Sequence, residues 1–168
     1  MNQISPYISD WASMATTSSR EPTVGFPFSN PWDISDGSSM EEATGVPYFY
    51  MTDMEMSVQD LVVDNKMSLS VTLDQGTYCH EQGLDAQDPP CGRVILVGSY
   101  SRLEKNSEEY EFAKSSLFAR HPQMEYWPED HGFFFARMNV EYITLLAGFG
   151  GANLVSVEDY FAASLADY

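Results

Sequence analysis

The chain has few basic side chains: eight Lys and Arg stand against 25 Asp and Glu, which gives a formal charge of -17. A protein that binds nucleic acid needs clustered Lys and Arg to displace counterions from the phosphates. Here the basic residues are scattered between Arg20 and Arg137. We therefore expect no nucleic-acid binding, and the same negative charge disfavours anionic membrane surfaces.

Long hydrophobic runs are also absent. No apolar stretch approaches the roughly 20 residues that a membrane-spanning helix needs, and no charged-then-apolar signal segment opens the chain. We expect a soluble chain without membrane insertion, and it stays open whether a signal peptide was removed before Met1. The 168 residues are 43% hydrophobic and 14% aromatic, which is enough for the core of one domain spanning residues 1–168.

Alternation of apolar and polar side chains predicts strands. It is clearest at residues 66–73, where Met67, Leu69 and Val71 alternate with small polar residues. The first 45 or so residues are rich in Ser, Thr, Pro and Gly and predict short strands and turns. Further strands are predicted at residues 11–19, at 46–53, at 93–100 with its apolar run ending at Gly98, and at 132–149 as two strands separated by a bend.

Predicted helices are few and short. Ser57, Asn106 and Ser156 can each cap the start of a helix, because each precedes an acidic residue by three positions. The second helix should end before Pro122, since a proline disfavours helical geometry in the residue before it. Strands at short spacing with small helices between them predict a mainly β (α+β) fold, a β-barrel decorated by helices.

The only two cysteines, Cys79 and Cys91, lie in a long loop between the third and fourth predicted strands. Loops of that length are usually tied down, functional or disordered. We expect a disulfide, which would close about a dozen residues, contribute about 3 kcal/mol and imply an oxidising compartment. A zinc site with His80 as third ligand lacks a suitably spaced fourth ligand, and two free buried thiols are the other alternative.

Five stretches resemble the CREG family, the cellular repressors of adenoviral early-gene-stimulated transcription. They follow one another in order and read DWASMATTSS, GVPYFYMTDM, GLDAQDPPC, AKSSLFARHPQMEYWPEDHGFFFARMN and FGGANLVSVEDYF. The resemblance runs from Asp10 to about Phe161. It implies a flavin mononucleotide (FMN)-binding split β-barrel related to the pyridoxine-phosphate oxidases, and a homodimer. It also implies a secreted or endolysosomal glycoprotein linked to growth and differentiation, with no established enzymatic activity.

One feature departs from that family. Animal members generally carry N-linked glycans and engage the mannose-6-phosphate receptor, but this chain has no Asn-x-Ser/Thr sequon. Asn106 is followed by Ser and Glu, and Asn139 by Val and Glu. Sorting that depends on such a glycan is therefore not expected here.

The turn that precedes the first predicted helix bears on cofactor binding. The phosphate of FMN calls for Arg, Lys or a helix amino terminus, and the catalytic relatives carry adjacent Arg and Lys at this turn. This chain has Asp53, Glu55 and Asp60 there and no cation. We expect no cofactor. The backbone amines of Ser57 and Val58 leave a weak anion site, and with it the alternative of an FMN-dependent oxidoreductase.

The segment from residue 120 to residue 139 combines histidines, a tryptophan and three phenylalanines. Neither His121 nor His131 has a carboxylate at a spacing that would orient it as a base, so we assign no catalytic residue. Three consecutive phenylalanines cannot all face one side of a strand, so at least one should meet a second surface such as a partner subunit. Candidate residues for a dimer interface or an occluded pocket are His121, Trp127, Phe133, Phe134, Phe135 and Phe149.

These features together predict a non-catalytic protein of the CREG type that holds no metal. We expect it to be secreted or endolysosomal, to form a homodimer, and to act in growth regulation and lysosomal function through an unidentified protein or receptor partner.

Overall fold

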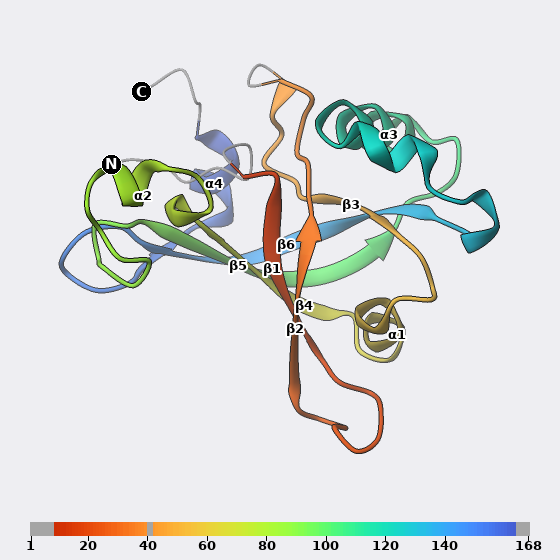
Figure 1. The fold of residues 1–168 in the computed structure, drawn as a ribbon, viewed down its shortest axis with the longest axis horizontal. Helices are drawn as coiled ribbons and strands as arrows, with labels where there is room; N and C mark the ends of the chain where they lie inside the picture. The colour runs from red at the N-terminus through yellow and green to blue at the C-terminus, as the bar shows by residue number, and fades with distance from the viewer. Residues whose placement is uncertain (1–8, 40–41, 164–168) are drawn as a thin grey trace.

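The computed structural model describes residues 9–39 and 42–163, and its strands form one mainly antiparallel sheet (Figure 1). The strand order is β2-β1-β4-β5-β6-β3, and β7 pairs with β6 beside this path. A mainly β fold is what the sequence predicts. The strands are β1 (Trp11–Thr17), β2 (Pro27–Asp33), β3 (Tyr48–Met51), β4 (Lys66–Thr72), β5 (Arg93–Arg102), β6 (Phe134–Leu146) and β7 (Asn153–Val155).

Short helices cover parts of the sheet (Figure 1). Helix α3 packs on β3 and β6, α1 packs on β1, and α4 packs on β6. The helices named in the described part of the chain are α1 (Met56–Val63), α2 (Tyr78–Glu81), α3 (Glu108–Arg120) and α4 (Val157–Ala162), and the 3-10 turns named there are η3 (Leu73–Gln75), η4 (Pro122–Tyr126) and η5 (Glu129–His131).

The helix starts agree with the sequence in one case of three. Ser156 caps α4 as predicted, because its side chain accepts a hydrogen bond from the backbone of Asp159. The cap of α3 is Ser107, one residue later than predicted, and Asn106 adopts a left-handed conformation with φ 67°. Ser57 is no cap at all: α1 begins one residue earlier, and its preceding residue provides no side-chain hydrogen bond.

Strand β4 shows why the alternating pattern is informative. Met67, Leu69 and Val71 are buried and point into the larger of two hydrophobic clusters, while the residues between them are less buried. Burial of one side chain of this size stabilises the fold by about 1.5 to 3 kcal/mol. The smaller cluster lies under α3 and includes Tyr48 and Phe135.

Strand β6 is one continuous strand rather than the two strands and a bend expected from the sequence. Its pairing with β5 shifts register between Val97 and Gly98, so a bulge provides the irregularity within an unbroken strand. Gly98 is required there, because a Cβ at this position would lie 1.9 Å from the carbonyl oxygen of Asn139. Strand β5 therefore continues past Gly98 to Arg102, where the sequence suggested an end.

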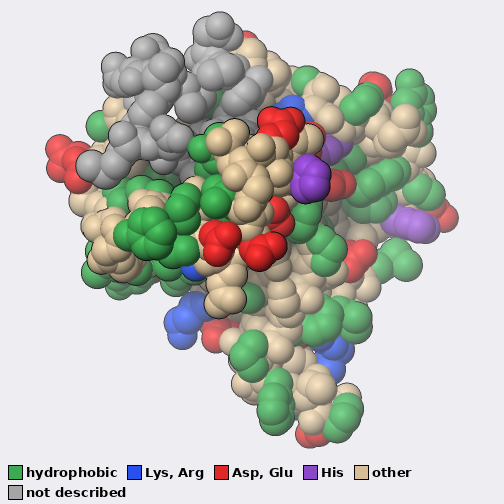
Figure 2. Space-filling view, turned by 60° about the vertical axis from the view of Figure 1, so that its left-hand side comes forward, with side chains coloured by type: hydrophobic (Ala, Val, Ile, Leu, Met, Phe, Trp, Pro, Cys, Tyr) green, Lys and Arg blue, Asp and Glu red, His purple; other side chains and the backbone are tan. Residues whose placement is uncertain are grey.

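The surface reflects the composition. Figure 2 shows acidic side chains over one face with few basic side chains among them. At the foot of the same view, hydrophobic side chains stand at the tip of the β1–β2 hairpin, where Val24 is 53% exposed and Phe26 is 65% exposed. No helix within the described residues is long and apolar enough to cross a membrane.

Candidate functional site

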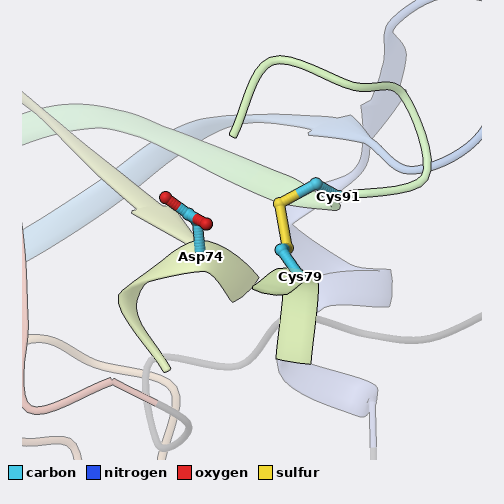
Figure 3. Close-up of side chains that lie close together, drawn as sticks. All are labelled: Asp74, Cys79 and Cys91. Carbon is cyan, nitrogen blue, oxygen red and sulfur yellow. A yellow bond between two sulfur atoms is a disulfide. The ribbon is translucent and has the colours of Figure 1, made fainter. Parts of the chain in front are cut away.

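The predicted disulfide between Cys79 and Cys91 is present (Figure 3). It joins α2 to the residues just before β5 across a Cα–Cα distance of 5.5 Å, and both cysteines are fully buried. Asp74 lies close to the two sulfur atoms, but His80 does not belong to this group. Because both sulfurs are bonded to each other, neither is a thiolate that could bind zinc.

Replacing both cysteines by Ala is expected to lower the free energy of unfolding by about 3 kcal/mol, because the unfolded chain without the bond regains the conformational entropy that the closed loop removes. Urea denaturation of the oxidised protein and of the double variant measures this difference. The control is Asp74→Asn, which changes a neighbouring exposed carboxylate and leaves the bond intact. Equal stability of the double variant and the parent protein would contradict a structural role for the disulfide.

A cleft of about 650 Å³ is the candidate binding site. It lies between β2, the turn from β3 to α1, and the segment that carries η4 and η5. Sequence positions more than 100 residues apart meet in it. The lining residues are Trp11, Asn30, Pro31, Trp32, Asp33, Tyr50, Thr52, Met54, Glu55, Met124, Trp127, Pro128, His131 and Phe133.

Stacked aromatic rings form one wall of the cleft. The ring of Tyr50 stacks on Phe133 and on Phe135 with centroid distances of 4.7 Å each, and on Trp127 at 5.8 Å. Such pairs each contribute about 0.5 to 1.5 kcal/mol beyond the area that they bury. Trp127 and Phe133, two of the residues expected at an interface or pocket, therefore do line a pocket.

The three consecutive phenylalanines are accommodated within the chain itself. Phe135 belongs to the cluster under α3, while Phe134 points the other way into the larger core, with the Arg102 guanidinium 3.4 Å from its ring centroid. The three consecutive phenylalanines therefore do not support the inference that one of them contacts a partner subunit. Phe149 is 87% exposed, and a role for it in a dimer stays a prediction.

The sequence predicts three acidic side chains without a cation at the turn before α1, but two of them form ion pairs in the structure. The Asp53 carboxylate pairs with Arg102 at 2.5 Å, and Asp60 is fully buried and pairs with Arg20 at 2.6 Å. Both Arg side chains come from segments distant in sequence, so the sequence of the turn alone does not predict these ion pairs. Ser57 and Val58 are buried too, so their backbone amines offer no accessible anion site.

Two carboxylates at the cleft remain without an ion pair among the described residues, Asp33 at the end of β2 and Glu55 before α1. Within residues 9–39 and 42–163, no Lys and no Arg belongs to the lining. A sequence pattern could hardly identify Asp33, because its place at the cleft depends on how β2 lies against the η4–η5 segment.

The histidines do not form acid–base pairs. His121 places its Nε2 2.9 Å from the backbone carbonyl oxygen of Ile34, at the end of α3 and outside the cleft lining. His131 lines the cleft beside Phe133, with 6.1 Å between ring centroids, and its carbonyl accepts a hydrogen bond from the Thr52 hydroxyl. Neither ring contacts a carboxylate in the described part of the chain, so no general base is assembled.

The comparisons with known proteins identify the family. A family model described as "CREG, beta-barrel" matches residues 8–162. The chain belongs to the CREG family. Protein CREG1 of Gallus gallus is 45% identical over 153 residues, which cover 90% of this chain and 79% of that protein.

Solved structures of similar fold confirm the split barrel. A heme-binding protein of Mycobacterium smegmatis superposes with a TM-score of 0.72 at 18% identity, over 93% of this chain and 56% of its own. A protein of the pyridoxinephosphate oxidase family from Clostridium acetobutylicum, related to general stress protein 26, gives a TM-score of 0.56 at 14% identity, over 91% of this chain and 89% of its own. The fold class predicted from the sequence is confirmed.

These neighbours raise the question of whether the cleft fits a flavin or a heme. The FMN phosphate and the heme propionates are anionic and need Lys, Arg or accessible backbone amines. The cleft instead presents Asp33 and Glu55, and the backbone amines of Ser57 and Val58 in the first turn of α1 are buried. His131 supplies an imidazole, but the charged groups around it are of the wrong sign. The residues present do not fit either cofactor.

Proposed function

We propose that this CREG-family chain is a non-catalytic binding protein of the secretory or endolysosomal route, which acts through a protein or receptor partner in growth regulation and lysosomal function. The observation that carries the proposal is the charge of the cleft: Asp33 and Glu55 stand where an anionic cofactor would need cations. The described residues contain no histidine–carboxylate pair, which also supports a protein without catalysis.

The compartment and the assembly are inferred from chemistry. The buried Cys79–Cys91 disulfide supports an oxidising compartment, because the reducing cytosol keeps most thiols free. The absence of a sequon supports a sorting route that does not depend on an N-linked glycan. A homodimer is proposed on the family resemblance, and light scattering that gives about twice the chain mass of 18.9 kDa would support it.

Flavin titration decides between the proposed function and an FMN-dependent oxidoreductase. We expect protein produced with flavin supplied to be colourless, and added FMN to show no saturable fluorescence quenching in the micromolar range. Each missing charge-assisted hydrogen bond to the phosphate forfeits about 1.5 to 3 kcal/mol, and approach to Glu55 adds repulsion.

The matched variant for this titration is Glu55→Lys, which reverses the charge at the turn. It should bind FMN more tightly than the parent protein if charge is the obstacle. A micromolar midpoint for the parent protein, followed by bleaching of the bound flavin with reduced nicotinamide cofactor, would establish the oxidoreductase and overturn the proposed function.

A further inference from the structure

All three tryptophans of the chain line the same cleft. Trp11 is 41% exposed, so this residue is accessible from solvent. Tyr50 and Phe133 add two further rings, stacked on each other at 4.7 Å. The faces of aromatic rings carry negative electrostatic potential and attract cations, most strongly for tryptophan.

The charges around these rings have the same sign. Asp33 and Glu55 line the cleft without an ion-pair partner in residues 9–39 and 42–163. Burial, together with the nearby Tyr110 and the Glu129 carboxylate, raises the pKa of Tyr50, so a further negative charge lies close by. Arg102 is not part of the lining, and its guanidinium pairs with Asp53 and lies over the ring of Phe134. The cleft therefore combines aromatic faces with unpaired carboxylates.

The size of the cleft suits a small molecule. Its volume of about 650 Å³ falls within the range of about 300 to 1,000 Å³ that is typical of ligand pockets. Met54, Met124 and the aromatic rings provide apolar surface for the body of such a ligand. The carboxylates stand at positions exposed to solvent, where they can meet a charged head.

We propose that this cleft binds organic cations, specifically amphipathic ammonium compounds with an apolar or aromatic body. Rings and methionines surround the body, and Asp33 and Glu55 neutralise the head. This site goes beyond the proposed function, since a non-catalytic protein acting through a partner needs no small-molecule site. Flavin titration and the experiment below can fail independently of each other.

Three probes that share one benzene ring test the charge preference: benzyltrimethylammonium, neutral benzyl alcohol and anionic benzoate. The oxidised chain of 168 residues is titrated with each at neutral pH, by intrinsic tryptophan fluorescence and by calorimetry. Fluorescence reports on the cleft directly because every tryptophan lines it. We expect the cation to bind about tenfold more tightly than the alcohol, a ratio that lies between the effects of an exposed and of a desolvated cation–aromatic contact, and benzoate not to bind.

Variants locate the effect. Asp33→Asn combined with Glu55→Gln should weaken benzyltrimethylammonium binding about tenfold and leave benzyl alcohol unchanged. Trp11→Leu should also weaken cation binding. Glu141→Gln is the control, because it removes an exposed carboxylate of β6 that is not part of the lining, and it should preserve the affinity.

Several results would overturn the site. Equal affinity for the cation and the alcohol would leave only an apolar cleft. An equal loss in the Glu141→Gln control would mean that the charge of -17 attracts cations to the whole surface. Absence of binding by calorimetry would show that there is no such site. Binding without a change in tryptophan fluorescence would show that the ligand binds outside the cleft.

Discussion

Asp60→Asn is expected to lower the free energy of unfolding by about 3 to 5 kcal/mol, the range found when one partner of a buried ion pair is removed. Asp60 is fully buried at the centre of a network of donors that joins α1 to β1 and the residues after it. One oxygen, Oδ1, accepts from the Ser19 backbone and hydroxyl, each at 2.8 Å, and from Arg20 at 2.6 Å. The other oxygen, Oδ2, accepts from the Thr16 hydroxyl at 2.9 Å.

An amide at this position removes the negative charge that Arg20 faces. Its oxygen can still accept from the Ser19 backbone N–H and from Arg20, which only donate, but its NH₂ then requires the Thr16 hydroxyl to turn and accept. The remaining hydrogen bonds go to a neutral oxygen in place of a carboxylate and are weaker. Urea denaturation of the parent protein and the variant measures the loss. The matched control is Asp64→Asn, at the end of the same helix, whose pair with Lys66 is long at 3.8 Å and exposed. It should cost less than about 1 kcal/mol.

The pH dependence of this loss identifies its cause. Burial by itself raises the pKa of Asp60, but the hydrogen bonds from Ser19, Thr16 and Arg20 outweigh it and hold the pKa below its ordinary value. The stabilising contribution is therefore present at neutral pH and disappears as the pH falls through the lowered pKa. The difference between the parent protein and Asp60→Asn should shrink in acid. A penalty that is constant with pH would point to altered packing instead.

Elements governed by local pattern could be predicted from the sequence. Strand β4 follows from the alternation of Met67, Leu69 and Val71, and the disulfide follows from two cysteines placed in one long loop. The cap at Ser156 needs only a side chain and an acidic residue three positions on. In each case the deciding residues lie close together in the chain, although the same cap pattern at Ser57 and at Asn106 does not mark the cap of its helix.

Features that depend on distant residues could not be predicted in the same way. In the sequence, Gly98 is typical of the end of a strand. In the structure, the backbone oxygen of Asn139 on the neighbouring strand lies where a Cβ of residue 98 would be, so glycine is needed inside the strand. In the sequence, Asp53 has no cation near it. In the structure, Arg102 at the end of β5 forms an ion pair with it. The cleft likewise exists only once β2 and the η4–η5 segment meet. Part of the charge prediction was therefore wrong, and Glu55 is the one acidic residue of the turn that lines the cleft.

A second buried carboxylate, Asp36, is expected to make the protein more stable in mild acid than at neutral pH. Burial raises the pKa of Asp36 from 3.8 to about 6, although the Arg120 guanidinium at 3.3 Å and the backbone N–H of Gly45 oppose the shift. On its other side lies Tyr160, whose own pKa is raised by burial and by the Asp36 carboxylate. Asp10, 74% exposed, shares the guanidinium of Arg120.

The sign of the effect follows from proton linkage. The folded protein holds the Asp36 proton more tightly than the unfolded chain does, so the stabilisation is complete below about pH 4 and is lost as the pH rises through about 6. A shift of roughly two units corresponds to about 3 kcal/mol. The neutral variant Asp36→Asn has no proton to lose. The unfolding free energy of the parent protein minus that of the variant should therefore fall by about 3 kcal/mol between about pH 4 and pH 7.

Urea denaturation at closely spaced pH values measures this difference. Subtracting the variant removes the general trend that arises from self-repulsion of a chain with charge -17. The control is Asp10→Asn, which removes the exposed partner of the same guanidinium and should keep the parent slope. A flat difference across the range would show that Arg120 holds Asp36 ionised in the folded protein at all these pH values.

The contributions of the two buried aspartates depend on pH in opposite directions. Asp60 contributes only where it is ionised, and Asp36 contributes only where it is protonated, so both contributions coexist below about pH 6 and above the lowered pKa of Asp60. That window is mildly acidic, as the proposed endolysosomal route would require. In the Asp36→Asn variant the upper limit of this window should disappear, while in Asp60→Asn the lower limit should. If either variant keeps both limits, its aspartate does not set the pH response.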